Sequence, residues 1–150
     1  ESAQKELKQR VEDAVAATKA AMEEGIVPGG GMALFYAGQE LRSQQGVAMG
    51  ILVAATESPI RAIIENSGQS PDAIISHLPK KSGWQGFDAG KQAIVDLKQS
   101  GIVDPLKVTK TALLNAVSVA ANYLVIGAAV SELPKKESGA APQMPQMPEY

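Results

Sequence analysis

The chain has 150 residues, the size of one domain with a single core, and a formal net charge of −2. Hydrophobic residues make up 45 % and aromatic residues only 4 %, which favours packed helices over a β-sandwich or barrel. The charge argues against nucleic-acid binding, and the apolar runs are too short to predict a membrane span. With no cysteine and one histidine, His77, we expect no disulfide and no histidine- or thiolate-based metal site.

The first part of the chain predicts helices separated by glycine. Apolar residues repeat at helical spacing over residues 4–24, and Gly25 followed by Pro28 should end that helix. A second helix is expected over residues 32–41, directly after the glycine triplet 29–31.

Proline positions divide the next stretch. A third helix is expected over residues 47–57. Ser58-Pro59 is typical of a helix start and predicts a separate fourth helix that ends near residues 66–68. Ser70-Pro71 repeats the pattern and predicts a short fifth helix that reaches residue 78.

In the last third, residues 80–88 contain glycine and aromatic residues and predict a loop, with a possible small β-hairpin near 83–88. A sixth helix is expected over residues 89–100. Asp104-Pro105 should cap a last helix over residues 106–130, whose broad apolar stripe indicates burial on most sides. The fold class is therefore all-α, or mainly helical.

The chain ends in a different composition. Residues 137–150 are rich in proline, glutamine and methionine and show no periodicity, so we expect a disordered tail that can be removed without loss of fold. The sequence opens at Glu1 inside a helical pattern and shows no targeting segment, so we expect a fragment of a longer protein.

Several positions could carry chemistry, and each also has an ordinary structural explanation. The glycine triplet before a helix suits either a tight turn or a phosphate contact. Asp13 could be a solvated surface charge, or could orient water or hold Mg²⁺. Asp104 could cap a helix, accept hydrogen bonds from sugar hydroxyls, or do both. Trp84 and Phe87 fit hairpin packing or a stacking platform for a base.

Taken together, these segments closely resemble the GroEL-type (group I, HSP60 family) chaperonins. The resemblance is collinear from about residue 6 to residue 136. It is carried by RVEDA at 10–14, EEGIVPGGG at 23–31, GFDA at 86–89, GIVDP at 101–105, KVT at 107–109 and LPK at 133–135.

The resemblance implies a domain plan. Residues 1–23 would be the returning helix of the intermediate domain, and residues 24–136 the C-terminal half of the equatorial ATP-binding domain. Such proteins are ATPases that assist protein folding and refolding. Their partners are other subunits of a double seven-membered ring, a co-chaperonin and unfolded proteins, the last two bound through an apical domain that this chain lacks. A bacterial cytoplasmic location is implied, with a mitochondrial or plastid homologue as the alternative.

The resemblance also implies roles for individual residues. Asp13 matches the aspartate that activates the attacking water, and Gly30 matches a backbone contact to the nucleotide. Asp88 and Ala89 match the pair that lines the adenine pocket, where some members have Asn instead of Asp. Asp104 matches the carboxylate that holds the ribose hydroxyls. ATP, Mg²⁺ and K⁺ are the implied cofactors.

The family's phosphate-binding loop and metal-binding aspartate lie in a segment outside this chain. We therefore expect the fragment to bind nucleotide weakly or not at all, to be inactive as an ATPase, and to self-associate through uncovered apolar surfaces. The alternative function is an isolated helical interaction or oligomerisation module without nucleotide binding. An unrelated small-molecule enzyme ranks last, because the sequence shows no catalytic constellation for one.

Overall fold

A computed structural model describes residues 1–79 and 83–132. They form the helices α1 (Ser2–Glu24), α2 (Met32–Leu41), α3 (Val47–Asn66), α4 (Pro71–His77) and α5 (Leu106–Leu124). Four short strands accompany them: β1 (Ile26–Pro28), β2 (Gln85–Asp88), β3 (Ala93–Asp96) and β4 (Val103–Pro105). The prediction of a mainly helical fold is confirmed. The predicted tail, residues 137–150, lies outside the described residues.

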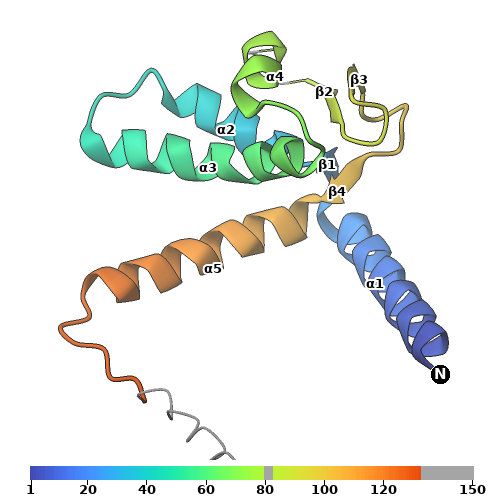
Figure 1. The fold of residues 1–150 in the computed structure, drawn as a ribbon, viewed down its shortest axis with the longest axis horizontal. Helices are drawn as coiled ribbons and strands as arrows, with labels where there is room; N and C mark the ends of the chain where they lie inside the picture. Colours follow the sequence, from blue (N-terminus) through green and yellow to red (C-terminus); the bar gives the residue numbers. More distant parts are fainter. Residues whose placement is uncertain (80–82, 133–150) are drawn as a thin grey trace, which may run out of the picture.

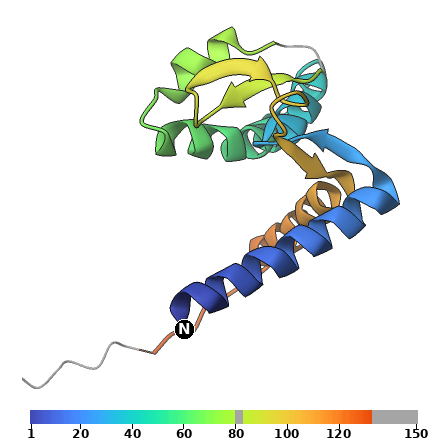
Figure 2. The ribbon, with the colours of Figure 1, turned by 90° about the vertical axis from the view of Figure 1, so that its right-hand side faces the viewer.

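The molecule consists of a lobe and two helical arms (Figure 1). The lobe contains α2, α3, α4 and the β2–β3 hairpin, and the arms α1 and α5 diverge from the β1–β4 pair below it. In the perpendicular view both arms point away from the lobe in the same general direction (Figure 2). Where the arms leave the strands, Lys107 is ion-paired with Glu23, and Lys110 with Glu24 at 2.6 Å.

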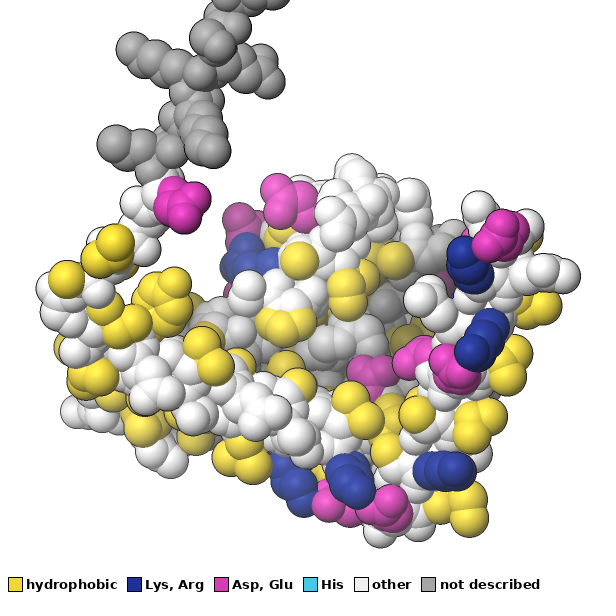
Figure 3. All heavy atoms as spheres, turned by 90° about the horizontal axis from the view of Figure 1, so that it is seen from below, with side chains coloured by type: hydrophobic (Ala, Val, Ile, Leu, Met, Phe, Trp, Pro, Cys, Tyr) yellow, Lys and Arg dark blue, Asp and Glu magenta, His cyan; other side chains and the backbone are white. Residues whose placement is uncertain are grey.

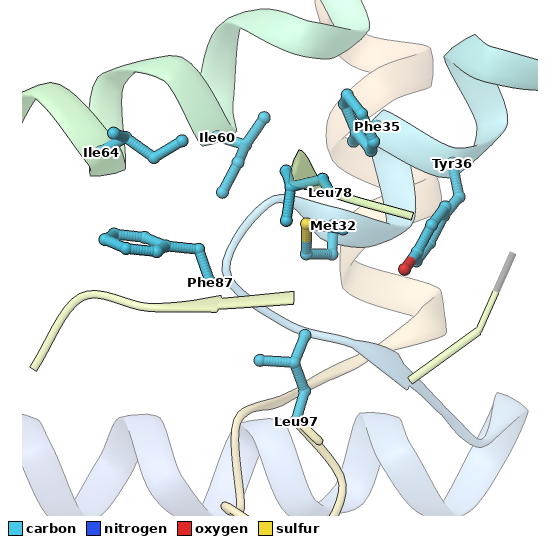
Figure 4. Packing of buried hydrophobic residues seen from close by; sticks show 8 residues of the cluster. All are labelled: Met32, Phe35, Tyr36, Ile60, Ile64, Leu78, Phe87 and Leu97. Carbon is cyan, nitrogen blue, oxygen red and sulfur yellow. The ribbon is translucent and has the colours of Figure 1, made fainter. Parts of the chain in front are cut away.

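The hydrophobic core lies in the lobe alone (Figure 4). Helix α2 presents one face to α3, and the hairpin closes the opposite side. The Tyr36 hydroxyl donates a hydrogen bond to the Gln85 carbonyl at 2.6 Å and so ties α2 to β2. The buried apolar residues are Met32, Phe35, Tyr36, Ile60, Ile64, Leu78, Phe87 and Leu97.

The expected break at Ser58-Pro59 is wrong, because α3 runs without interruption from Val47 to Asn66 with Pro59 inside it. An interior proline costs a helix about 3 kcal/mol. Here the turn after Pro59 buries Ile60 and Ile64 completely, and such burial stabilises a fold by roughly 1.5–3 kcal/mol per side chain. Tertiary packing therefore outweighs the local signal.

Helix α3 is also long and apolar enough to cross a membrane by length and composition, with a mean hydropathy of 1.5 over its best window. In this fold it carries the ion-paired residues Glu57 and Arg61, and it supplies Ile60 and Ile64 to the core. Its C-terminal half packs in the core, whereas Val47 and Ile51 near its start are exposed.

The predicted helix over residues 89–100 is wrong, and the small hairpin predicted near 83–88 is present but extends from Gln85 to Asp96. Strand β3 pairs antiparallel with β2, with Phe87 opposite Ile94, and a turn covers residues 97–100. The Asp88 side chain fastens the connecting turn, as described below. The hairpin buries Phe87 and Leu97, and this burial gives the strand its advantage over a helix.

The last helix differs from prediction in three ways. Asp104 is not its cap: it lies in β4 opposite Val27, and no side chain caps α5. The helix ends at Leu124, and residues 126–132 are irregular. No residue of α5 is buried, although the sequence indicated burial on most sides. The apolar surface that the pattern marks is real, but the described residues leave it uncovered.

Candidate functional site

The glycine triplet forms a tight turn between β1 and α2, and a different constraint at each of the three positions favours glycine. A side chain at Gly29 would meet the backbone of Ile102 and Val103 at 3.0 Å, where the Gly29 amide donates to the Ile102 carbonyl at 3.1 Å. Gly30 and Gly31 adopt the left-handed φ values +64° and +79°, which favour glycine. At Gly31 a Cβ would also lie 2.9 Å from the backbone nitrogen of Ile60 in α3.

The β1–β4 ladder brings Asp104 to this turn from far along the sequence. Ile26, Val27 and Pro28 pair with Pro105, Asp104 and Val103, respectively. Because β4 follows the Ile102 carbonyl that holds Gly29, the ladder places Asp104 at one side of the glycine turn. The connection was absent from the sequence prediction, since no local pattern marks strands of three residues.

Asp104 lines an apolar groove between the lobe and the start of α5. The Asp104 side chain makes no ion pair or hydrogen bond with any described residue, and burial raises the pKa of its carboxyl. Helix α2, the Pro59 turn of α3 and the first turns of α5 complete the groove. Its lining residues are Gly31, Ala33, Leu34, Pro59, Asp104, Pro105, Val108, Thr109 and Ala112. Sequence reasoning missed Pro59, Val108 and Thr109, because each carries an ordinary local role in its own helix.

The groove suits a ligand with a flat apolar body and hydroxyl groups. An unpaired, partly buried carboxylate accepts hydrogen bonds, and its ionised form is stabilised by donors such as sugar hydroxyls. No lysine or arginine is among the lining residues that the structure describes, so nothing in this groove neutralises a phosphate chain. The residues present can contact an apolar group and accept hydrogen bonds from hydroxyl groups.

Asp88 and Ala89 directly follow Phe87, whose backbone approaches the glycine turn. The Phe87 carbonyl oxygen is 3.9 Å from where a Cβ of Gly30 would stand, so the start of the hairpin turn abuts the glycine turn. Asp88 Oδ1 accepts hydrogen bonds from the amides of Gly90 at 2.9 Å and Lys91 at 3.1 Å. These bonds, the Lys91 amide first, hold the pKa of Asp88 below its ordinary value. Ala89 packs against the core.

Asp13 is separate from these residues. It lies in the middle of α1, is exposed, and forms no ion pair or hydrogen bond with the residues that the structure describes. Helix α1 packs chiefly against α5 and β4. The structure thus places Asp104 beside the glycine turn through the β1–β4 ladder, and Phe87, the residue before Asp88, near Gly30. Gly30, Asp88 and Ala89 are not among the residues that line the Asp104 groove, and Asp13 lies on the arm.

Metal ligands are not grouped in the described part of the chain. Residues 1–79 and 83–132 contain no cluster of three or more His, Cys, Asp or Glu side chains that could hold a cation.

Fold and groove together define a mainly helical binding domain with a carboxylate beside a glycine turn. Compared with known protein families, residues 1–133 match the model of the TCP-1/cpn60 chaperonin family. The match covers most of the chain, and the chain belongs to this family. The family supports a chaperone role, has ATPase activity in general, and implies assembly of subunits into an oligomer.

Proposed function

We propose that this chain is part of a group I, GroEL-type subunit of an ATP-driven chaperonin, and that it supplies the nucleoside-binding side of the nucleotide site. The observation that carries the proposal is Asp104, a partly buried carboxylate without a partner in an apolar groove beside the glycine turn. The Asp104 side chain is half-buried and its oxygens remain open to solvent, so hydroxyl groups of a ligand can take the place of water there.

In the proposed site, Asp104 accepts the ribose hydroxyls, and the Gly30 backbone and the turn at Asp88-Ala89 border the base. Asp13 would activate the attacking water, and this role rests on the family resemblance alone. Bound ATP with Mg²⁺ and K⁺ would supply the reactive phosphate chain and its counter-charges. In the complete subunit, co-chaperonin and unfolded proteins would bind through another domain, and we expect a bacterial cytoplasmic location.

A nucleotide titration of the 150-residue chain, followed by ¹H–¹⁵N NMR, tests the proposal. We expect ADP at millimolar concentration to shift the amide signals of Gly30, Ala89 and Asp104, with a Kd weaker than about 0.1 mM. Asp104→Ala should remove these shifts, while Glu65→Ala, which removes an exposed carboxylate of α3, should keep them. Shifts spread over both arms, or equal shifts in Asp104→Ala, would contradict the proposed site. Micromolar binding would contradict the expectation that this chain offers no binding site for the phosphate groups.

The role of Asp13 needs the complete subunit. Asp13→Ala should leave ATP binding nearly intact and slow single-turnover hydrolysis by about a hundredfold or more. Glu12→Ala, the neighbouring carboxylate, serves as the control. If Asp13→Ala hydrolysed ATP within a few-fold of the wild-type rate, the assignment of the water-activating role to Asp13 would be wrong.

A second candidate, an interaction module without nucleotide binding, is favoured by the uncovered arms. Large apolar side chains on α5 such as Leu114 (63 % exposed) and Tyr123 (75 % exposed) face solvent. Self-association together with no nucleotide-dependent shift at millimolar ADP would select this function over the first.

A further inference from the structure

The hydrogen-bonding capacity of the Asp88 side chain is directed at its own turn. The side chain is 12 % exposed. Oδ1 accepts both the Gly90 and the Lys91 amides, and Oδ2 lies 3.5 Å from Lys91 Nζ. An aspartate that holds the amides two and three residues ahead is a typical turn fastener.

This turn is coupled to the glycine turn through packed backbone. Asp88 pairs with Ala93 across the hairpin, and Phe87, directly before it, is buried in the core at 2 % exposure. The Phe87 carbonyl reaches the glycine turn at Gly30, as described above. A change in the 88–91 turn can therefore reach the backbone at Gly30 through Phe87, and Asp88 need not touch a ligand to influence the glycine turn.

We propose that Asp88 is a positioning residue, which fastens the 88–91 turn and thereby holds the backbone that lies against Gly30, rather than a side chain that contacts the base. The inference rests on the proposed function for the identity of the ligand. The clasp, by which we mean the pair of hydrogen bonds from the Gly90 and Lys91 amides to Asp88 Oδ1, does not depend on the proposed function.

The clasp is tested first without any ligand, by amide hydrogen exchange in the 150-residue chain. Asp88→Ala should speed exchange at Gly90 and Lys91 by about tenfold or more and shift the Gly30 amide signal, because both amides lose their acceptor. Asp88→Asn should keep exchange within about threefold of wild type, because its carboxamide oxygen accepts the same two amides. Lys91→Met, which removes only the ion pair, should behave like Asp88→Asn.

Two outcomes would overturn the clasp. One is unchanged exchange and an unchanged Gly30 signal in Asp88→Ala. The other is faster amide exchange at Gly90 and Lys91 in Asp88→Asn. This measurement can still be made if Asp88→Ala does not fold.

The ligand part is tested with ADP and IDP, which differ in the 6-amino group of the base. If Asp88 only positions the turn, the ratio of the two Kd values should agree within about twofold between wild type and Asp88→Asn. If Asp88 contacts the base, exchanging a carboxylate for a carboxamide that also donates should change this ratio by about tenfold. Absence of binding by either nucleotide to wild type would count against the proposed nucleoside site, while the exchange measurements would still decide the clasp.

Discussion

At the scale of single residues, Asp104 and Asp88 are two aspartates with opposite environments. Burial raises the pKa of Asp104, whereas backbone amides lower that of Asp88. A carboxyl whose pKa is raised by folding stabilises the fold only while it is protonated, and this stability is lost as pH rises through the folded-state value. A carboxyl whose pKa is lowered contributes stability above its ordinary pKa, which is lost as pH falls.

The two aspartates therefore predict opposite pH effects on stability. Relative to wild type, the free energy of unfolding of Asp104→Asn should rise between about pH 3 and pH 7, because the variant avoids ionising a buried carboxyl. For Asp88→Asn it should fall as pH rises to about pH 5 and stay level above, because the pKa of Asp88 is lowered in the folded chain. Urea denaturation at several pH values measures both. A pH-independent difference for Asp104→Asn would indicate that Asp104 is fully solvated in the folded chain.

Glycines 31 and 68 provide a matched test of the glycine turn. Both have φ +79°, but a Cβ at Gly31 would strike the backbone of Ile60, whereas nothing lies within 4 Å of one at Gly68. Gly68→Ala should cost about 1–2 kcal/mol for the left-handed backbone alone. Gly31→Ala should cost about 1–3 kcal/mol more, because the added methyl group forces α2 and α3 apart. Denaturant unfolding of both variants decides the point, and equal losses would contradict the close approach.

At the scale of elements, α3 is tied to its neighbours by a charge network around Glu57. Glu57, 7 % exposed, pairs with Arg42 after α2 and with Arg61 one turn along, both at 2.7 Å. Arg61 also reaches Asp72 in α4 at 2.8 Å. The network joins three helices at a point where Pro59 removes a backbone donor from α3.

The two acidic partners of Arg61 should contribute unequally to stability. Glu57→Gln should lose about 1–2 kcal/mol, since it removes charge-assisted bonds from a buried side chain whose arginine partners stay partly solvated. Asp72→Asn should lose less than about 0.5 kcal/mol, because the Asp72 side chain is 83 % exposed. Urea denaturation at low and high salt separates the two. A larger loss in Asp72→Asn would show that the surface pair is the main tie between α3 and α4.

The elements that could be predicted from sequence are those with local signals. Helices α1, α2 and α4 have periodicity and end signals within their own span, and they lie close to where the pattern puts them. The errors arise where distant packing decides. Pro59 stays inside α3 because Ile60 and Ile64 are buried, and residues 93–96 pair with β2 instead of forming a helix.

In the candidate site, too, features with a local sequence signal could be predicted, and features that depend on distant packing could not. The glycine turn could be recognised from its residues, because three consecutive glycines before a helix have few other uses. The groove could not, since Pro59, Asp104 and Thr109 come from different elements and meet only through the β1–β4 ladder. The sequence pattern predicts that Asp104 caps a helix, which it does not do. Only the family resemblance indicated that Asp104 belongs to the same site as the glycines.

At the scale of the whole molecule, apolar side chains lie exposed along both arms. Figure 3 shows hydrophobic side chains on α5 at the left and on α1 at the right. Leu7 and Val11 on α1 are 63 % and 55 % exposed, and Leu114 and Val119 on α5 are 63 % and 58 % exposed. Surfaces of this kind are typical of sites where another chain or segment packs.

We therefore predict that the 150-residue chain self-associates into dimers or small oligomers and does not form rings of seven. Light scattering at tens of micromolar measures the mass. The double variant Leu114→Glu/Val119→Glu should shift the population toward monomer, while Gln99→Glu, which adds negative charge away from the arms, should not. A strictly monomeric, folded wild-type chain would refute the association, and a seven-membered ring would refute the stated size.

The β1–β4 pair also means that the chain enters and leaves the lobe at one place. The Leu106 amide donates to the Gly25 carbonyl at 3.1 Å, and the whole core lies between Met32 and Leu97. The lobe is thus built like an insertion whose two ends meet, the arrangement in which domains tolerate transplantation into a host loop. Residues 25–106 could be grafted between neighbouring residues of another protein, or closed head to tail by a short peptide. Either graft would carry the glycine turn, Asp88 and Asp104 with it and leave both arms behind.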